Sequence, residues 1–208
     1  MYIPGHFQGD DASVSELLDG ITVGDLVTAT ERGPVATLLP LLYDASTGDR
    51  GSLVGHVARN NDQWSRPALG EAMVIVRGPD AYITPNWYAT KNDHGRVVPT
   101  WNYVTAHVYG RLVVHDDVDW LEALVRRLTD RHESRSSHPW SVDDAPRGFI
   151  DGQLRAIVGV ELSISRIEAK FKLSQNRPAS DVDGVIAGLN ADGQTPVADA
   201  TRSARDRA

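Results

Sequence analysis

The feature of this sequence that most restricts its fold is a long alternation of apolar and polar residues between positions 103 and 115. A period of two is that of a β-strand with one buried and one accessible face. The accessible face would carry Thr105, His107, Tyr109 and Arg111. The apolar residues that share the other face are Val104, Ala106, Val108, Leu112 and Val114. One long strand of a mostly β fold is therefore expected here.

Several shorter segments also have the composition of strands, and turn residues separate them. The segments are 26–30, 35–43, 53–58, 72–76, 81–84 and 158–164. Positions 31–34 and 78–80 carry Gly and Pro in the order typical of turns, so each is expected to separate two strands. About six to eight mostly hairpin-linked strands with a few helices predict a mostly antiparallel β-barrel with helical additions.

The last strand changes face partway along. Apolar residues occupy even positions up to Ile164 and odd positions from Ile167 onward. Because a slip of one residue turns every following side chain to the opposite face, we expect a bulge or sharp bend near Ser165 and Arg166.

Helices are expected at four places. Ser13, with Glu16 three residues later, has the spacing of a capping box and predicts a helix start. Positions 118–128 carry apolar residues at helical spacing, with acids before them and arginines towards their end. Shorter helices are expected near 149–157 and 181–189. From 191 the composition is small, polar and charged, which predicts a domain over 1–190 and a disordered tail over 191–208.

Composition excludes several classes of protein. There are no cysteines, so disulfides, thiolate metal sites and cysteine nucleophiles are excluded. The net charge of -7 argues against broad attraction to nucleic acid. The apolar runs are too short to cross a bilayer, and the start lacks the basic and apolar regions of a secretory signal, so the expected compartment is the cytoplasm.

The stretch 55–64 has the highest density of hydrogen-bonding side chains, and it follows the apolar run 53–57. Arg59 offers a planar fork of donors suited to an oxyanion, and Asn60 adds an amide beside it. His56 can donate or accept a hydrogen bond or bind a metal. A strand that runs into such a group is a candidate site for a phosphate-bearing cofactor.

Structural alternatives exist for the same residues. His56 is equally consistent with a core histidine, and Arg59 with a surface arginine paired to Asp62. No phosphate-binding glycine loop, His-Glu-x-x-His zinc motif or G-x-S-x-G elbow is present. His56, His107 and His115 do not have the spacing of a metal site.

Two further groups of side chains are open to both structural and functional interpretations. An aromatic group could fill the barrel or contact a planar ligand, and a basic group could be a solvated face or bind a phosphate or carboxylate. The aromatic group is Trp87, Tyr88, Trp101 and Tyr103, and the basic group is Lys170, Lys172 and Arg177.

Five ordered motifs resemble one family, the PaiB-like proteins described as FMN-binding negative transcriptional regulators. The motifs cover most of the chain from Met1 to about Leu189. They are the segments 1–7, 55–64, 78–88, 99–103 and 170–177, with sequences MYIPGHF, GHVARNNDQW, GPDAYITPNWY, PTWNY and KFKLSQNR.

This resemblance implies a split β-barrel related to the pyridoxamine-phosphate oxidases, with peripheral helices. It implies a homodimer with FMN at the subunit interface. Arg59 would meet the FMN phosphate, with His56 and Asn60 beside it. The ring would be lined by Thr37, Trp101 and Asn102, and Lys170 and Gln175 would reach the same pocket.

The resemblance leaves the function open between three classes. The protein is expected to be a flavoprotein, acting as a negative transcriptional regulator or as a flavin-dependent oxidoreductase on a small molecule. The alternative is a haem enzyme similar to piperazate synthases, which form an N–N bond, with His56 as the axial ligand. Direct binding to DNA is disfavoured because the chain is acidic and shows no helix-turn-helix.

Overall fold

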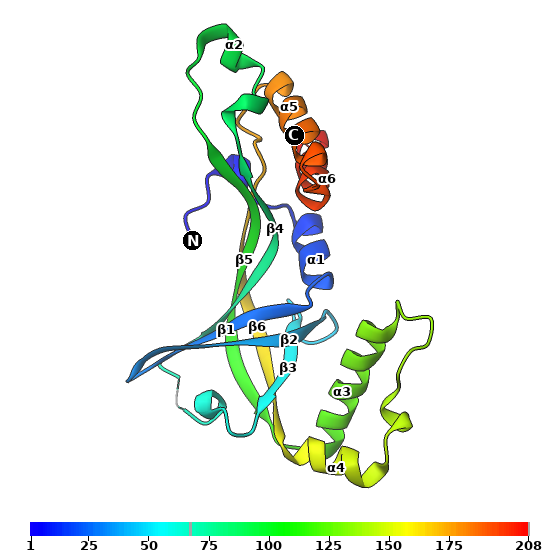
Figure 1. The fold of residues 1–208 in the computed structure, drawn as a ribbon. Helices are drawn as coiled ribbons and strands as arrows, with labels where there is room; N and C mark the ends of the chain where they lie inside the picture. The colour runs from blue at the N-terminus through cyan, green and yellow to red at the C-terminus, as the bar shows by residue number, and fades with distance from the viewer. Residues whose placement is uncertain (67, 208) are drawn as a thin grey trace. The chain divides into compact units, whose positions relative to one another are not determined.

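The structure is a computed structural model that describes residues 1–66 and 68–207. Figure 1 shows its strands and helices in chain order. The strands are β1 (Val23–Thr30), β2 (Gly33–Asp44), β3 (Ser52–Ala58), β4 (Ala72–Ile83), β5 (Thr100–His115) and β6 (Ile157–Lys172). The helices are α1 (Asp11–Asp19), α2 (Thr90–His94), α3 (Val118–Glu133), α4 (Arg147–Arg155), α5 (Ala179–Ala191) and α6 (Thr195–Asp206).

The strands close a barrel in the order β1-β2-β3-β6-β5-β4. The first two form the expected antiparallel hairpin, in which Thr30 pairs with Gly33 across a turn. Strand β3 pairs antiparallel with β2 on one side and with β6 on the other, where His56 lies opposite Gly159. The alternation predicted for β5 is confirmed at Val104, Ala106 and Val108, all of which are buried.

The chain divides into two compact units. The barrel unit contains residues 16–76 and 107–167, and the terminal unit contains residues 1–15, 77–106 and those from 168 onward. Each unit is described by itself below.

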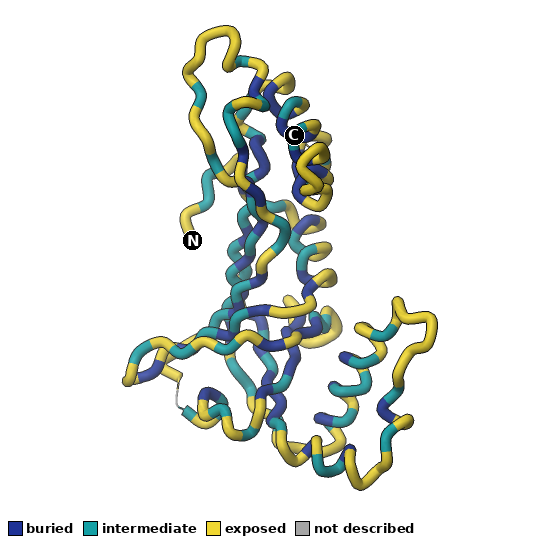
Figure 2. Tube along the Cα trace, in the orientation of Figure 1, coloured by how far each residue is buried: buried dark blue, intermediate teal, exposed yellow. Residues whose placement is uncertain are grey.

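In the barrel unit, α3 is an amphipathic helix that covers one side of the sheet (Figure 2). Asp117 caps it by accepting a hydrogen bond from the backbone N–H of Trp120, at 2.8 Å. Leu124 and Leu128 pack against Leu42 of β2 and Val54 of β3. Another part of the same helix packs on α4 through a second cluster, which consists of Leu121, Val142, Ile150 and Leu154.

In the terminal unit, α5 and α6 lie against each other (Figure 1). Two glycines of α5 leave a notch for Trp87. A Cβ at Gly184 would lie 1.9 Å from the carbonyl oxygen of Trp87, and one at Gly188 would lie 2.3 Å from its indole ring. Asp181, which is fully buried in the first turn of α5, accepts hydrogen bonds from the backbone N–H and the hydroxyl of Thr90 at 2.9 and 2.8 Å. This helix therefore fixes the segment that follows β4.

Two local expectations are wrong. Positions 78–80 do not form a turn, because β4 runs without interruption from Ala72 to Ile83. The β1–β4 pairing covers only Met73 to Ile75 of β4, so Pro79 interrupts none of those hydrogen bonds. The N-terminal helix begins earlier than predicted, at Asp11, and Asp10 rather than Ser13 supplies the capping oxygen, 2.7 Å from the backbone nitrogen of Ser13.

The expected change of face in β6 is present, since Ile164 and Ala169 are buried and the two residues at the predicted bend, Ser165 and Arg166, are exposed. The tail expected to be disordered contains α6 instead, and Ala208 lies outside the described residues. Small residues of α6 at helical spacing are buried, so a segment with little apolar character still packs. These residues are Val197, Ala198, Thr201 and Ala204. No helix in the described part of the chain is long and apolar enough to cross a membrane.

Candidate functional site

Arg59 follows the end of β3, and its side chain makes bonds within the barrel unit. Its Nη1 and Nη2 lie 3.0 and 2.5 Å from the two carboxylate oxygens of Asp116. Its Nε donates to the carbonyl of Arg155 at 2.8 Å, and Nη2 also donates to the carbonyl of Ile157 at 3.0 Å. The alternative pairing with Asp62 is wrong, because Asp62 pairs with Arg66.

The ion pair shifts the pKa of each side chain in the direction expected for opposite charges. The bonds to Arg59 hold the pKa of Asp116 below its usual value, and the bonds to Asp116 raise the pKa of Arg59. Both side chains are partly exposed, at 36% and 54%, so the pair contributes little to folding stability. A phosphate with nearly two negative charges is a stronger partner for a guanidinium than one carboxylate.

Thr37 belongs to a network that fastens the segment after β3 to the β1–β2 hairpin. Its hydroxyl donates to Oε1 of Gln63 at 2.6 Å and accepts from Nδ2 of Asn61 at 2.9 Å. The amide nitrogen of Gln63, which is 1% exposed, donates to the carbonyl of Leu26 at 3.0 Å and to the hydroxyl of Thr28 at 3.1 Å. The amides of Asn61 and Gln63 therefore hold the local fold, whereas Asn60 is exposed.

His56 is half-buried on β3. Its Nδ1 is buried and has no hydrogen-bond partner among the described residues. Burial lowers the pKa of His56, which favours the neutral imidazole. The residue opposite is Gly159, where a Cβ would lie 2.2 Å from the ring of Trp120, so register places His56 on the face of the barrel next to Trp120.

A second histidine lies on that face. His115 stacks on Trp120, with ring centroids 4.0 Å apart, and its Nε2 lies 2.8 Å from Oε2 of Glu161. Within the described residues, no group of three or more His, Cys, Asp or Glu side chains is arranged to hold a metal ion. The arrangement leaves the buried Nδ1 of His56 without a hydrogen-bond partner among the described residues.

The terminal unit holds the other four predicted residues. Trp101, 48% exposed, lines a hollow of about 660 Å³ together with Tyr82 and Trp87. Its Nε1 donates to Asp80 at 3.0 Å, and its ring meets that of Tyr82 edge to face with centroids 6.1 Å apart. An exposed indole held in this way offers a flat surface to a planar ligand.

Asn102 points the other way along β5 and is fully buried. Its amide nitrogen lies 3.0 Å from the hydroxyl of Ser174, which donates in turn to the Asn102 carbonyl oxygen at 3.2 Å. Ser174 has a left-handed backbone, with φ of 68°, and these bonds stabilise it in that conformation. The geometry gives Asn102 a structural role.

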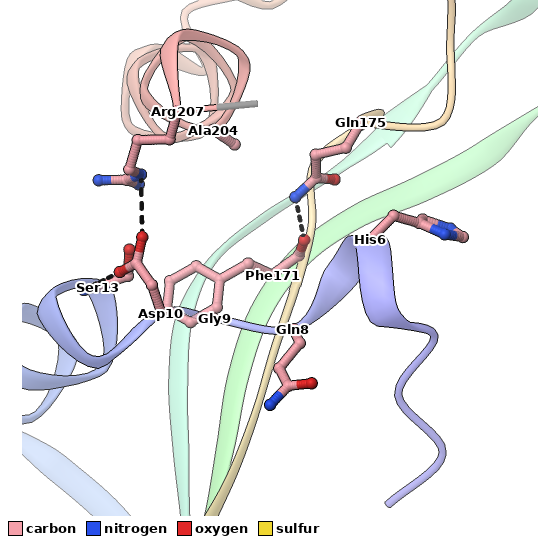
Figure 3. A pocket seen from close by; sticks show the side chains of 9 residues that line it. All are labelled: His6, Gln8, Gly9, Asp10, Ser13, Phe171, Gln175, Ala204 and Arg207. Atoms are coloured by element: carbon pink, nitrogen blue, oxygen red, sulfur yellow. Dashed lines mark hydrogen bonds and ion pairs between the residues drawn. The ribbon is translucent and has the colours of Figure 1, made fainter.

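Gln175 lines a different pocket, of about 260 Å³, shown in Figure 3. Its amide nitrogen donates to the carbonyl of Phe171 at 2.6 Å, and its oxygen accepts from the backbone N–H of Leu173 at 2.7 Å. Across the pocket, Asp10 faces Arg207 at 3.9 Å. Most polar groups of this pocket are therefore already bonded to the protein.

Lys170 extends from the other face of β6. Its Nζ donates to the carbonyl of Tyr2 at 3.2 Å and lies 5.5 Å from the centroid of the Tyr103 ring. The structure thus places the predicted residues in two groups. Thr37, His56, Arg59 and Asn60 belong to the barrel unit, and Trp101, Asn102, Lys170 and Gln175 belong to the terminal unit.

One residue near these groups has no role in the sequence-based site, Asp116, which bonds Arg59. Asp116 comes directly after the long strand β5, which ends at His115, and this position is the signal that places it at the end of a strand. Lys172 shares a face of the strand with Lys170, as the spacing of two predicts, and it belongs to the basic group identified in the sequence.

The comparisons with known proteins define the class. A family model described as "Putative FMN-binding domain" matches residues 1–166, and the chain belongs to this family. A curated relative is "Protease synthase and sporulation protein PAI 2" of Bacillus subtilis, 33% identical over 191 residues, which are 91% of this chain and 89% of the relative. The PaiB-like resemblance is therefore confirmed.

Solved structures show the fold. A conserved hypothetical protein of Mycobacterium tuberculosis is 12% identical with a TM-score of 0.57, and the match covers 86% of this chain and 94% of the other. An FAD and haem binding protein of Mycobacterium smegmatis is 20% identical with a TM-score of 0.56, covering 86% and 78%. The predicted split β-barrel with peripheral helices is confirmed.

Proposed function

We propose that this protein binds FMN and uses it in a redox reaction on a small molecule. The observation that carries the proposal is the family match over residues 1–166, which includes Arg59, Trp101 and the unpartnered nitrogen of His56. Bound flavin supplies hydride or single-electron transfer, and the protein holds and orients it.

The residues of the two units fit a flavin nucleotide in different ways. Arg59 would bind the FMN phosphate in place of Asp116. The exposed amide of Asn60 is next to Arg59 in the sequence. His56 offers its free Nδ1, and Trp101 offers an exposed ring. We propose that Thr37, Asn102 and Gln175 support these contacts by holding the backbone around them, since their own polar groups are bonded within the protein.

The absorption spectrum of the freshly purified protein tests the cofactor. Flavin gives bands at about 370 and 450 nm, and adding FMN to colourless protein should restore them. A protein that is colourless and takes up no FMN would contradict the proposal.

Haem is the second candidate, and His56 favours it. A buried, neutral imidazole with an unpartnered nitrogen is the form of histidine that ligates iron. The same spectrum separates the two cofactors, because haem gives an intense band at about 400 nm. Loss of that band in His56→Ala, with the fold retained by circular dichroism, would assign the axial ligand to His56.

We also propose that the active form is a homodimer. Apart from Asp25, which pairs with Leu38, the outward side of the β1–β2 hairpin carries apolar residues, and Leu38 and Val23 are exposed at 64% and 47%. Val23 pairs with Pro40, and Val27 pairs with Ala36 on the same side. Such a surface favours burial against a second copy. Sedimentation should give a dimer for the wild type and a monomer for Leu38→Asp, whereas a monomeric wild type would exclude the dimer.

Any effect on transcription is proposed to follow from the flavin reaction and not from direct DNA contact. The chain carries a net charge of -7, which repels the phosphate backbone. A gel shift at low salt is the test, and a retarded, salt-sensitive band would overturn this part of the proposal.

A further inference from the structure

Two lysines of β6 form a cationic surface on the terminal unit. Lys170 and Lys172 are separated by one residue and lie on one side of the strand, where both approach the ring of Tyr103. Their Nζ atoms lie 5.5 and 6.0 Å from its centroid. Lys172 also lies 6.0 Å from the ring of Phe7. Aromatic faces hold the two ammonium groups in place through cation–π attraction.

Neither ammonium group has an anionic partner among the described residues. Lys170 donates to the carbonyl of Tyr2 at 3.2 Å. Lys172 donates to the hydroxyl of Thr100 at 2.7 Å and to the carbonyl of Trp101 at 2.5 Å. The neighbouring acid on the strand, Glu168, is paired with the amino group of Met1. All acceptors of the two lysines are therefore neutral.

A third cation lies near the pair. Arg177 is placed over the ring of Tyr88 at 4.5 Å and makes no ion pair within the described chain. Burial, together with repulsion by Lys170 and Arg177, lowers the pKa of Lys172. Lysines on a fully solvated surface can move apart. Holding these cations together in a half-buried position costs free energy because they repel each other and lose water, and a bound anion would offset that cost.

We propose that Lys170 and Lys172, with Tyr103 between them, bind an oxyanion group, a phosphate or a carboxylate, of a small ligand. An ammonium group has three donors, so one bond from Lys170 and two from Lys172 leave donors free for oxygen atoms. This surface is distinct from the pocket of Figure 3, which Phe171 and Gln175 line. The proposal does not depend on the identity of the cofactor.

The experiment is a titration of the full-length protein with inorganic phosphate, followed by ³¹P NMR in a buffer with constant chloride. We expect saturable binding with a Kd on the order of 1 mM. Lys170→Met and Lys172→Met should each weaken it at least about tenfold, because each removes a charge-assisted hydrogen bond. Lys172→Arg keeps the charge and should retain most of the binding.

Lys91→Met is the matched control. It makes the same change in the same unit, at a lysine whose Nζ donates to the side chain of Asn86. Thermal unfolding of each variant verifies that the fold is retained. Absence of saturable phosphate binding to the wild type would overturn the proposal. So would folded Lys170→Met and Lys172→Met variants that bind phosphate as Lys91→Met does.

Competition then identifies the source of the oxyanion. If FMN displaces phosphate and riboflavin does not, the site takes the phosphate of the flavin itself. If phosphate or acetate still binds to FMN-saturated protein, the site takes a separate small acid. Either result supports an oxyanion site at the two lysines and assigns its occupant.

Discussion

Arg59 and Asp116 are joined at two points, Nη1 to Oδ2 at 3.0 Å and Nη2 to Oδ1 at 2.5 Å. The residue expected to anchor a phosphate thus already holds an anion supplied by its own chain. If Arg59 binds the phosphate as proposed, the ligand must compete with Asp116 for the guanidinium, and this competition can be measured.

If Arg59 exchanges Asp116 for the FMN phosphate, the two partners have opposite effects on affinity. Arg59→Ala should weaken FMN binding at least about tenfold through loss of a charge-assisted contact. Asp116→Asn should strengthen it by a few-fold, because the competing charge is gone. Fluorescence quenching of FMN measures both, with Arg66→Ala as the control, since Arg66 pairs with Asp62. Equal FMN affinity in Arg59→Ala and wild type would show that the phosphate lies elsewhere.

His56 should make the fold sensitive to mild acid. Its pKa is lowered from 6.5 by burial, so below about pH 6.5 the unfolded chain binds a proton that the native chain resists. Stability is therefore expected to fall as the pH decreases through this range. In cofactor-free protein, the melting temperature of His56→Gln should decrease less between pH 8 and 5 than that of the wild type. Parallel curves would show that His56 is accessible to protons in the native state.

Gly159 is predicted to tolerate no side chain, because a Cβ would lie 2.2 Å from the ring of Trp120. Gly159→Ala should destabilise the fold by about 1–3 kcal/mol through overpacking. Gly148→Ala is the control, since nothing lies within 4 Å of that Cβ, and in a helix it should be neutral or stabilising. Urea unfolding measures both. Combining Gly159→Ala with Trp120→Ala should cost less than the sum of the two changes, and strict additivity would contradict the clash.

Gln63 is expected to be among the most sensitive polar positions. Gln63→Leu removes the hydrogen-bond partner of the Thr37 hydroxyl and of the Leu26 carbonyl next to a buried side chain. The substitution should lower the free energy of unfolding by about 2–4 kcal/mol. The control is Asn60→Ala, three residues earlier and exposed, which should change stability by less than about 0.5 kcal/mol. Similar urea midpoints for the two variants would remove the structural role assigned to Gln63.

Much of the fold could be predicted because short-range patterns determine it. The hairpin of β1 and β2, the alternation in β5 and the amphipathic α3 each depend on local spacing, and each is present. The turn expected at 78–80 was wrong because Gly, Pro and Asp favour a turn locally, and the local sequence does not show the neighbouring strands that keep β4 extended. The helix α6 was missed because small residues bury well only when a partner such as α5 is already in place.

The site was less predictable for a similar reason. Residue types correctly marked the stretch after β3 as polar, but sequence does not show which donors are already satisfied. Gln63 and Asn61 bond the β1–β2 hairpin, and Arg59 bonds Asp116, a residue 57 positions away. Partners so distant in sequence have no local pattern.

The notch that Gly184 and Gly188 form around Trp87 has a consequence for how this family varies. At Gly188, where a Cβ would meet the indole ring, a larger residue is acceptable only if position 87 becomes smaller at the same time, whereas at Gly184 the clash is with the backbone carbonyl of Trp87 and no change of that side chain relieves it. Positions 87 and 188 should therefore change together among relatives, and position 184 should stay glycine. The segment between β4 and α2 is consequently free to diverge in surface chemistry while its attachment to α5 stays fixed.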